Sequence, residues 1–546
     1  MPITLAHINE AIAEAIPDRE AIVTRDHRFT WRDLQLRSRR LAHVLREAGL
    51  GLRRERSELA RWESGQDHVA LYLYNGHEYL EAMGGAFEAR AVPFNVNARY
   101  VDEELAYLFR DSAARAIVYH AGFAERLARV LEQIPAPVLL LQVDDGTDPP
   151  LLPGARRYED ALAQASDAPL PPDWSEDDLY MVYTGGTTGM PKGVLWRQHD
   201  IFYAALGGRI PGQPAVGGID EIVDRARNGG SRPLRSPPRM RCARHCTSFC
   251  NLPQGGTVVV QSNVRSLDPD DIWSTIERER VVSLSIVGDA FARPLIDQLD
   301  RRSYDLSNLV VVGSGGALFS PDNKRALLQR LPQLIVADGF GASETGAQGA
   351  TITTATTEVP PAFKMDEHTL VLSAELDRVL EPGDAETGWL ARKGHVPLGY
   401  LGDEAKTRRT YPEVDGVRYA VPGDRAQRLA DGDVRVLGRD SVCINTGGEK
   451  VFAEEVEQAL KRHPAVYDAL VVGTPSERWG QQVTAVVALR EGAAATSEEL
   501  REAAAAEIAR YKLPRAVVFV PAIVRAPSGK PDYHWARRVA VESLTD

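Results

Sequence analysis

Cysteine is scarce in this chain, and its scarcity excludes a fold built on disulfides. The 546 residues contain four cysteines, which is typical of a protein from a reducing compartment. Three of them, Cys242, Cys246 and Cys250, crowd into one short segment. A chain of this length exceeds what one hydrophobic core accommodates, so we expect at least two domains.

Long apolar runs and an excess of positive charge are also missing. No run of apolar residues reaches the length that spans a bilayer, so no transmembrane segment is expected. Residues 1–20 lack the basic and apolar regions of a signal peptide, which favours a cytoplasmic protein. The formal net charge of −12 argues against a nucleic-acid partner but permits a local nucleotide site.

Short apolar stretches alternate with longer amphipathic ones over most of the chain. Strands are predicted at 21–23, 68–74, 116–119 and 138–143, with a helix over 6–15 and Thr30 as the N-cap of another. Proline- and glycine-rich stretches such as 227–238 are predicted loops. The alternation predicts an α/β fold with a largely parallel sheet.

After residue 438 the pattern changes to a shorter α+β unit. Helices are predicted at 451–463 and 497–510, and strands at 465–473 and 483–489. We therefore expect a large N-terminal domain of parallel-rich sheets and helices over 1–438. A small C-terminal domain would occupy 439–546.

One segment combines glycines, hydroxyls and a lysine directly after a strand-like run. Glycines allow a tight turn whose N–H groups point at an anion, and Lys192 adds a positive charge. The alternative, a flexible turn with chance hydroxyls, is disfavoured by their density. Lys192 lies between Pro191 and Gly193, so this is not a Walker A loop, and a kinase or P-loop ATPase is excluded. The predicted polyphosphate-binding residues are Thr184, Gly185, Gly186, Thr187, Thr188, Gly189 and Lys192.

The loop ends in Pro-Lys-Gly and resembles the first core motif of the adenylate-forming superfamily of acyl-CoA synthetases, luciferase-type enzymes and peptide-synthetase adenylation domains. Further motifs of that superfamily follow this loop in order, and the resemblance as a whole covers nearly the entire chain, from about Ile8 to about Val541. The resemblance implies an enzyme that converts a carboxylic acid and ATP into an acyl-adenylate and pyrophosphate. It would then transfer the acyl group to a thiol, most plausibly coenzyme A, and release AMP.

The segment around Glu344 resembles the motif that this superfamily places beside the triphosphate. The resemblance implies that Glu344 is a catalytic hard-oxygen ligand for Mg²⁺ and that Thr345 contacts the α-phosphate. Asp338, Gly339 and Phe340 belong to the same match and are expected to contact ATP. Taken alone, a Ser-Glu pair after a glycine turn would be a helix N-cap.

Three further matches complete the implied nucleotide site. Gly315 and Gly316 follow a strand-like run and would lie against the adenine and the acyl group, with a plain strand end as the alternative. Asp424, in a Gly-Asp pair, would accept hydrogen bonds from the ribose hydroxyls. Arg439 would reach the ribose or a phosphate.

The last matches fall in the expected small domain, which the resemblance implies is mobile. Asp440 would be the hinge about which this domain rotates. Gly447 and Gly448 would let the pantetheine arm of coenzyme A pass close to the backbone. Lys530 would be the catalytic lysine of adenylation, sharing with Lys192 the stabilisation of charge on the α-phosphate.

The resemblance is strongest to actinobacterial synthetases for fatty acids or steroid side-chain acids, through the Thr-Gly-Gly loop, Trp196-Arg197 and residues 287–292. It implies ATP, Mg²⁺ and coenzyme A as cofactors and co-substrates, and it leaves a homodimer open. Three alternatives remain. They are an adenylation enzyme that loads a carrier protein, a catalytically impaired adenylate-binding protein and a luciferase-like oxygenase.

One segment departs from the family pattern. After Pro237-Pro238 the family has x-Met-His-Gly and an apolar helix, whereas this chain continues with an arginine- and cysteine-rich stretch over 239–250. Four hypotheses account for this stretch. It could result from an altered reading frame or from ordinary divergence, or it could form an anion pocket for a charged substrate. It could also be a metal site of Cys242, His245, Cys246 and Cys250. Burying several arginines in an apolar pocket is costly, so we expect local disorder or an exposed helix and a weakened acyl pocket.

Overall fold

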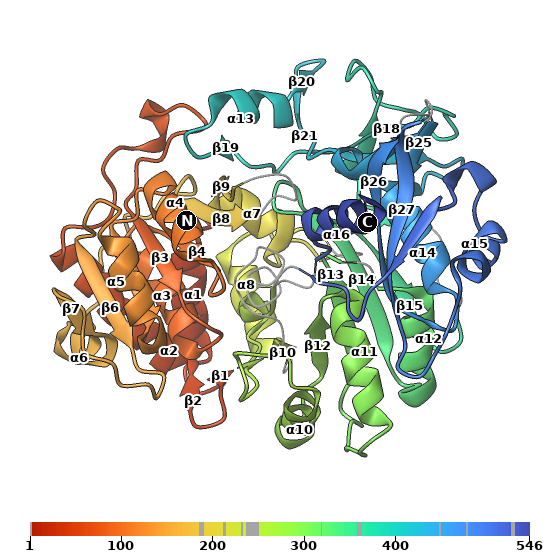
Figure 1. The fold of residues 1–546 in the computed structure, drawn as a ribbon. Helices are drawn as coiled ribbons and strands as arrows, with labels where there is room; N and C mark the ends of the chain where they lie inside the picture. Colours follow the sequence, from red (N-terminus) through yellow and green to blue (C-terminus); the bar gives the residue numbers. More distant parts are fainter. Residues whose placement is uncertain are drawn as a thin grey trace.

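Five β-sheets with helices packed on them make up the part of the chain that the structure describes (Figure 1). In this computed structural model the described residues are 3–184, 190–210, 214–230, 233–235, 250–317, 319–357, 363–446, 449–476, 479–525 and 530–545. Among them, no helix is both long and apolar enough to cross a membrane.

The N-terminal sheet is parallel throughout, as the alternating sequence pattern predicts. Its strands are β3 (His68–Tyr72), β4 (Val92–Asn95), β5 (Ala116–His120), β6 (Leu139–Val143) and β7 (Ala155–Arg157). The helices of this region are α1 (Leu5–Ala15), α2 (Trp31–Glu47), α3 (His77–Glu88), α4 (Asp102–Asp111), α5 (Ala124–Leu131) and α6 (Tyr158–Gln164). The strand order is β4-β3-β5-β6-β7. Every residue of β3, β5 and β6 is buried, as expected of parallel strands covered on both faces.

A nine-stranded sheet extends across the large domain. Its strands are β1 (Glu20–Val23), β2 (Arg28–Thr30), β10 (Pro233–Arg235), β11 (Val258–Val259), β12 (Ser283–Ile286), β13 (Val311–Gly315), β14 (Ile335–Ala342), β15 (Gly346–Thr353) and β16 (Lys364–Met365). In the spatial order β1-β11-β10-β12-β13-β14, neighbouring strands pair in parallel. Strand β2 at one edge and strands β15 and β16 at the other pair antiparallel. Strand β10 shows that the predicted loop over 227–238 was wrong in part. It begins with a proline, a position that strands tolerate but that a sequence pattern marks as a loop.

Two smaller sheets carry strands of the candidate site. One contains β8 (Leu179–Thr184), β9 (Lys192–Arg197) and β19 (Gly399–Tyr400). The other contains β17 (Thr369–Leu372), β18 (Gly388–Lys393), β20 (Glu413–Val414), β21 (Val417–Ala420), β22 (Asp424–Arg428) and β23 (Val434–Arg439). The remaining α-helices of the large domain are α7 (Gln198–Ala205), α8 (Ile219–Asn228), α10 (Pro269–Glu279), α11 (Gly288–Leu299), α12 (Pro321–Arg330) and α13 (Glu404–Thr410).

The C-terminal unit has the α+β character that its sequence predicts. Its elements are β24 (Cys443–Thr446), β25 (Glu449–Phe452), α14 (Ala453–Lys461), β26 (Val466–Ser476), β27 (Gly480–Leu489), α15 (Ser497–Ala505), β28 (Ala516–Phe519) and α16 (Tyr533–Thr545). The predicted helix over 451–463 was wrong at its start, because Val451 is fully buried and pairs with Ile444 in a hairpin. Helix α15 also ends before the predicted residue 510, inside an alanine run whose composition does not mark a helix end.

Single turns of 3₁₀ helix complete the described elements: η1 (Arg56–Glu58), η2 (Ala121–Phe123), η3 (Leu252–Gln254), η4 (Asp440–Val442) and η5 (Arg510–Lys512). Thr30 caps α2 as predicted. Its hydroxyl accepts from the N–H of Asp33, and the Asp33 carboxylate accepts from the Thr30 N–H, which forms a capping box.

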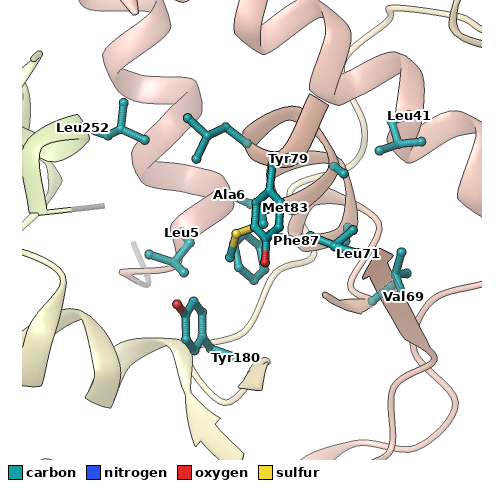
Figure 2. Packing of buried hydrophobic residues seen from close by; sticks show 14 of the residues in the cluster. Leu5, Ala6, Leu41, Val69, Leu71, Tyr79, Met83, Phe87, Tyr180 and Leu252 are labelled. Carbon is teal, nitrogen blue, oxygen red and sulfur yellow. The ribbon is translucent and has the colours of Figure 1, made fainter. Parts of the chain in front are cut away.

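Helix α3 packs against the strand that leads into the candidate phosphate loop. Tyr79, Met83 and Phe87 gather on one side of α3, with Tyr180 of β8 beside them (Figure 2). The rings of Phe87 and Tyr180 have centroids 6.1 Å apart. Each of these large side chains stabilises the fold by roughly 1.5–3 kcal/mol through its burial. The core therefore fixes the position of β8.

Candidate active site

The candidate phosphate loop connects β8 to β9. The two strands pair antiparallel with Thr184 opposite Lys192, so the ends of the loop are held together. Both side chains are half-buried. The other predicted loop residues, Gly185, Gly186, Thr187, Thr188 and Gly189, lie outside the described residues and stay a prediction.

Two carboxylates flank Lys192 without binding it tightly. Its Nζ lies 3.7 Å from Asp111 Oδ1 and 3.7 Å from Asp403 Oδ2. Burial lowers the pKa of Lys192, but a hydrogen bond with Tyr107 and the two carboxylates outweigh burial and raise the pKa above its usual value. The ammonium is therefore charged at neutral pH, and neither carboxylate holds it at hydrogen-bonding distance.

Glu344 and Thr345 lie in the turn between β14 and β15. Thr345 is fully buried, and its hydroxyl hydrogen-bonds within this hairpin. Trp196, also fully buried, donates its indole N–H to the carbonyl of Ser343 over 2.9 Å. This bond ties the turn that presents Glu344 to the strand that begins with Lys192.

A tyrosine that the motifs did not predict holds the Glu344 carboxylate. The hydroxyl of Tyr400 donates to Glu344 Oε1 over 2.8 Å, and both side chains are buried. Burial and the Glu344 charge raise the pKa of Tyr400, so its hydroxyl stays protonated. Lys406 Nζ lies 4.1 Å from the centroid of the Tyr400 ring. Tyr400 reaches Glu344 because β19 pairs with β9, and no local sequence signal reveals that pairing.

Asp424 and Arg439 face each other across β22 and β23. Arg439 Nε lies 3.5 Å from Asp424 Oδ1. Burial raises the pKa of Asp424 and the Glu344 charge adds to the rise, whereas the charges of Arg439 and Lys530 oppose it. Burial lowers the pKa of Arg439, but Asp424 and Glu344 outweigh burial and raise it. These four side chains therefore act on one another within a single site.

The predicted glycines lie at the ends of β13 and β14, which pair in parallel. Gly315 pairs with Gly339, and a Cβ on Gly315 would lie 3.2 Å from the Gly339 carbonyl oxygen. Gly316 has φ +82°, a conformation that favours glycine. A Cβ on Gly316 would lie 3.9 Å from Lys530 Cε, so the lysine side chain passes directly beside this backbone. Phe340, half-buried, follows in β14.

Asp338 has a charged partner inside the large domain. Lys324 Nζ lies 2.7 Å from Asp338 Oδ2, and both side chains are buried. Burial raises the pKa of Asp338, and the charge of Lys324 opposes the rise. The ion pair ties α12 to β14, and a direct contact of Asp338 with ATP stays a prediction.

The predicted hinge residue is anchored to the large domain. Asp440 Oδ1 accepts from Arg425 Nε over 2.9 Å, and the Asp440 N–H donates to the carbonyl of Gly423 over 3.0 Å. The predicted coenzyme A residues Gly447 and Gly448 lie outside the described residues.

The unusual segment over 239–250 lies outside the described residues except for its last position. Cys250 is half-buried, and its Sγ donates to the carbonyl of Ala205 over 2.7 Å. The other members of the predicted metal site, Cys242, His245 and Cys246, and the predicted anion pocket cannot be placed among the described residues.

A separate cluster of His199, Asp200 and His395 has the residue types of a metal site. His395 Nδ1 lies 2.8 Å from Asp200 Oδ1, and Arg197 Nε donates to Asp200 Oδ2 over 2.6 Å. A cavity of about 450 Å³ adjoins them. Because both Asp200 oxygens are engaged, the cluster is an ion-pair network that joins α7 to the segment before β19.

Comparison with known proteins finds relatives along the whole chain. The AMP-binding enzyme family matches residues 9–372, and the AMP-binding enzyme C-terminal domain matches residues 455–530. The medium-chain acyl-CoA ligase Mig of Mycobacterium avium is 52% identical over 541 residues, 98% of each chain. The 3-oxocholest-4-en-26-oate–CoA ligase of Rhodococcus rhodochrous is 42% identical over 549 residues, 98% of this chain and 96% of the relative.

Solved structures confirm the fold class. The anthranilate CoA ligase AuaEII in complex with anthranoyl-AMP has a TM-score of 0.80 at 18% identity, covering 100% of this chain and 98% of the other. ATP-bound MatB from Rhodopseudomonas palustris has a TM-score of 0.79 at 23% identity, covering 98% and 99%. The α/β architecture with a large N-terminal and a smaller C-terminal domain is therefore that of adenylate-forming enzymes. The motifs, the fold and two family matches agree, and the chain belongs to the AMP-binding enzyme family.

Proposed function

We propose that this chain is an ATP-dependent acyl-CoA ligase that activates a medium-chain, longer fatty or steroid side-chain carboxylic acid. One observation carries the proposal. Glu344, Asp424, Arg439 and Lys530 come from distant parts of the sequence, and their charges act together on the pKa values of Asp424 and Arg439. Lys192 begins strand β9, which the Trp196 bond ties to the turn that carries Glu344. Such a set suits a polyanionic nucleotide that undergoes attack at a phosphate. The names of the two ligases with 52% and 42% identity support the substrate class.

The nucleotide would be held at both of its ends. Asp424 can accept hydrogen bonds from two ribose hydroxyls, and Arg439 beside it adds donors toward the ribose or a phosphate. Thr184 and Lys192 stand at the two ends of the phosphate loop. Gly315, Gly316 and Gly339 place no side chain at the ends of β13 and β14, so a flat base could lie against the backbone there.

The Glu344 carboxylate has the chemistry of a magnesium ligand. Glu344 is a buried carboxylate whose direction Tyr400 fixes, and Mg²⁺ prefers hard oxygen ligands shared with nucleotide phosphates. The ion, held by Glu344 and phosphate oxygens, would neutralise charge on the departing pyrophosphate.

The reaction would proceed in two steps. First, a carboxylate oxygen of the acid bonds to the α-phosphorus while the bond to the bridging oxygen breaks and pyrophosphate leaves. The ammonium of Lys530, beside Gly316, would stabilise the developing negative charge. Second, the sulfur of coenzyme A bonds to the acyl carbon, and AMP departs with the electron pair of the broken bond.

The second step would need a different orientation of the C-terminal domain. We place the domain boundary between 438 and 439 and the hinge at Asp440, which lies between the two family matches. Rotation there would withdraw Lys530 and present Gly447 and Gly448 to the pantetheine arm.

A cytoplasmic location, where ATP and coenzyme A are available, belongs to the proposal, and light scattering tests whether the chain forms a homodimer.

The proposal is tested by following AMP and pyrophosphate with ATP, Mg²⁺ and coenzyme A across medium-chain, long-chain, aryl and steroid side-chain acids. Acid-dependent AMP formation with a matching thioester is expected. Transfer to a pantetheinylated carrier protein in preference to coenzyme A would favour the carrier-loading alternative. Binding of ATP without AMP formation from any acid would favour the impaired adenylate-binding protein, which similarity to named ligases over nearly the whole chain does not support.

A further inference from the structure

The side chain of Lys530 lies against the large domain, although the residue belongs to the C-terminal unit. Its Cε would lie 3.9 Å from a Cβ on Gly316, and its charge opposes the rise that burial causes in the pKa of Asp424. The C-terminal domain therefore has the orientation that brings this lysine to the candidate nucleotide site.

An ion-pair network supports the chain on both sides of Lys530. Arg525 donates from Nε and Nη2 to the two oxygens of Asp468, each over 2.8 Å. An antiparallel bridge joins Arg525 to Pro531, which directly follows the lysine. Lys461 Nζ lies 3.2 Å from Asp468 Oδ1. The network therefore ties Arg525, and through the bridge Pro531 next to Lys530, to strand β26.

The large domain contacts the same strand through Arg293 of α11. Its Cζ lies 5.0 Å from the ring centroid of Tyr467, the neighbour of Asp468 in β26. The Arg293 side chain is only 8% exposed, and its Nη2 lies 3.7 Å from Asp289 Oδ2. Figure 1 shows β26 on the side of the molecule that carries α11 and β13.

Charges on the two sides of this interface act on one another. Burial raises the pKa of Asp468, but Lys461, Arg525 and, from the large domain, Arg293 outweigh burial and hold the pKa well below its usual range. Burial lowers the pKa of Arg525, but Asp468 and, from the large domain, Asp289 are among the carboxylates that outweigh it. Arg293 of the large domain therefore attracts Asp468 of the C-terminal domain, and Asp289 of the large domain attracts Arg525.

We propose that Arg293, Tyr467, Asp468 and Arg525 form an interdomain latch that holds Lys530 in the position for adenylation. The latch rests on the proposed function, because Lys530 acts on an α-phosphate only in an adenylate-forming enzyme. Its members are positioning residues that act through Lys530.

The latch stabilises only the orientation seen here. Rotation of the C-terminal domain would take the Tyr467 ring away from Arg293 and expose a buried guanidinium to water. A contact made in one of two states shifts their populations by its own free energy. Weakening the latch should therefore slow adenylation and leave the transfer from adenylate to coenzyme A unimpaired.

The first test compares the two half-reactions in matched variants. Arg293→Met and Tyr467→Leu should each slow adenylation by about 5- to 30-fold, the loss of a desolvated cation–π contact. Thioester formation from pre-made acyl-adenylate should change less than about 2-fold, within the error of such comparisons. Tyr467→Phe keeps the ring and should behave as the parent chain.

Arg490→Met is the matched control. Arg490 also lies over the Tyr467 ring, at 6.0 Å, but it belongs to the C-terminal domain and donates to the carbonyl of Pro464 there. Its loss should affect neither half-reaction. Equal slowing by Arg490→Met and Arg293→Met, or equal loss of both half-reactions in Arg293→Met, would overturn the latch.

A second readout does not depend on turnover. Spin labels on non-canonical residues at exposed Gln329 of α12 and Glu502 of α15 report the distance between the domains. Arg293→Met and Tyr467→Leu should broaden this distance distribution or shift it, and Arg490→Met should not. If the distribution responds but no acid yields AMP, the proposed function fails while the interdomain contact stands. An unchanged distribution in both latch variants refutes the latch even in an active ligase.

Discussion

The hydroxyl of Tyr400 offers a sharp test of how Glu344 is positioned, because one atom can be removed without changing the packing. Tyr400→Phe deletes the donor that lies 2.8 Å from Glu344 Oε1. The ring remains, and its contact with Lys406 at 4.1 Å is kept. The Glu344 carboxylate would then lose the bond that fixes its direction, and with it the orientation proposed for binding Mg²⁺ and the phosphates.

The size of the effect follows from the charge of the acceptor. A hydrogen bond from a hydroxyl to a buried carboxylate contributes about 1.5–3 kcal/mol. If Glu344 needs this orientation in the transition state, kcat/KM should fall by about 10- to 150-fold. The apparent affinity for Mg²⁺ with ATP should weaken in the same variant.

Tyr411 supplies a control of the same chemistry. Its ring centroid is 6.0 Å from that of Tyr400, and its buried hydroxyl has no hydrogen-bond partner among the described residues. Tyr411→Phe should leave activity unchanged and be neutral or stabilising by up to about 1 kcal/mol. The assay is acid-dependent pyrophosphate release over a Mg²⁺–ATP titration. A loss below about 2-fold in Tyr400→Phe, or equal losses in both variants, would refute the reasoning.

Other parts of the structure carry further expectations. Lys530→Ala should abolish adenylation yet leave thioester formation from pre-made adenylate much less affected, and equal loss of both steps would contradict its assigned role. Burial raises the pKa of Glu88 from 4.5 to about 8. The folded chain therefore keeps the Glu88 proton where the unfolded chain has lost it, and the free energy of unfolding falls as pH rises from about 4.5 to about 8. Glu88→Gln, which retains an acceptor for Gln35, should therefore gain in Tm over the parent between about pH 5 and pH 8.5, and a pH-independent difference would contradict the assignment. Lys324→Met should cost about 3–5 kcal/mol by leaving Asp338 buried and unpaired, and calorimetry should show most of the loss recovered when Asp338→Asn is added.

The sequence predicts the class of fold and the order of the site residues because both depend on local patterns. The Thr30 capping box and the parallel strands of the first sheet follow from neighbouring residues. The motif residues Lys192 and Lys530 lie far apart in the chain, and family resemblance alone relates them. Local pattern also fails where an element starts with an atypical residue, as at Pro233 of β10.

Contacts that depend on strand pairing could not be predicted. Tyr400 meets Glu344 only because β19 pairs with β9, and the Trp196 bond to Ser343 depends on the same sheet. Nothing near Tyr400 in the sequence distinguishes it from a core aromatic. The contact between Arg293 and Tyr467 is even harder to predict from the sequence, because it exists only once two domains have folded and docked.

The arrangement gives a physical reason for placing one lysine on a separate domain. Lys192, Glu344 and Asp424 lie in the large domain, and Arg439 ends strand β23 at the proposed domain boundary. The negative charges of Glu344 and Asp424 would need cations once a polyanion binds beside them. In the proposed mechanism Lys530 would add positive charge when the phosphate is attacked, and its departure would remove that charge when AMP has to leave. Burial and Glu344 would then raise the pKa of Asp424 without opposition from Lys530, which would weaken its hold on the ribose. Domain rotation would thus couple the end of adenylation to a looser nucleotide site.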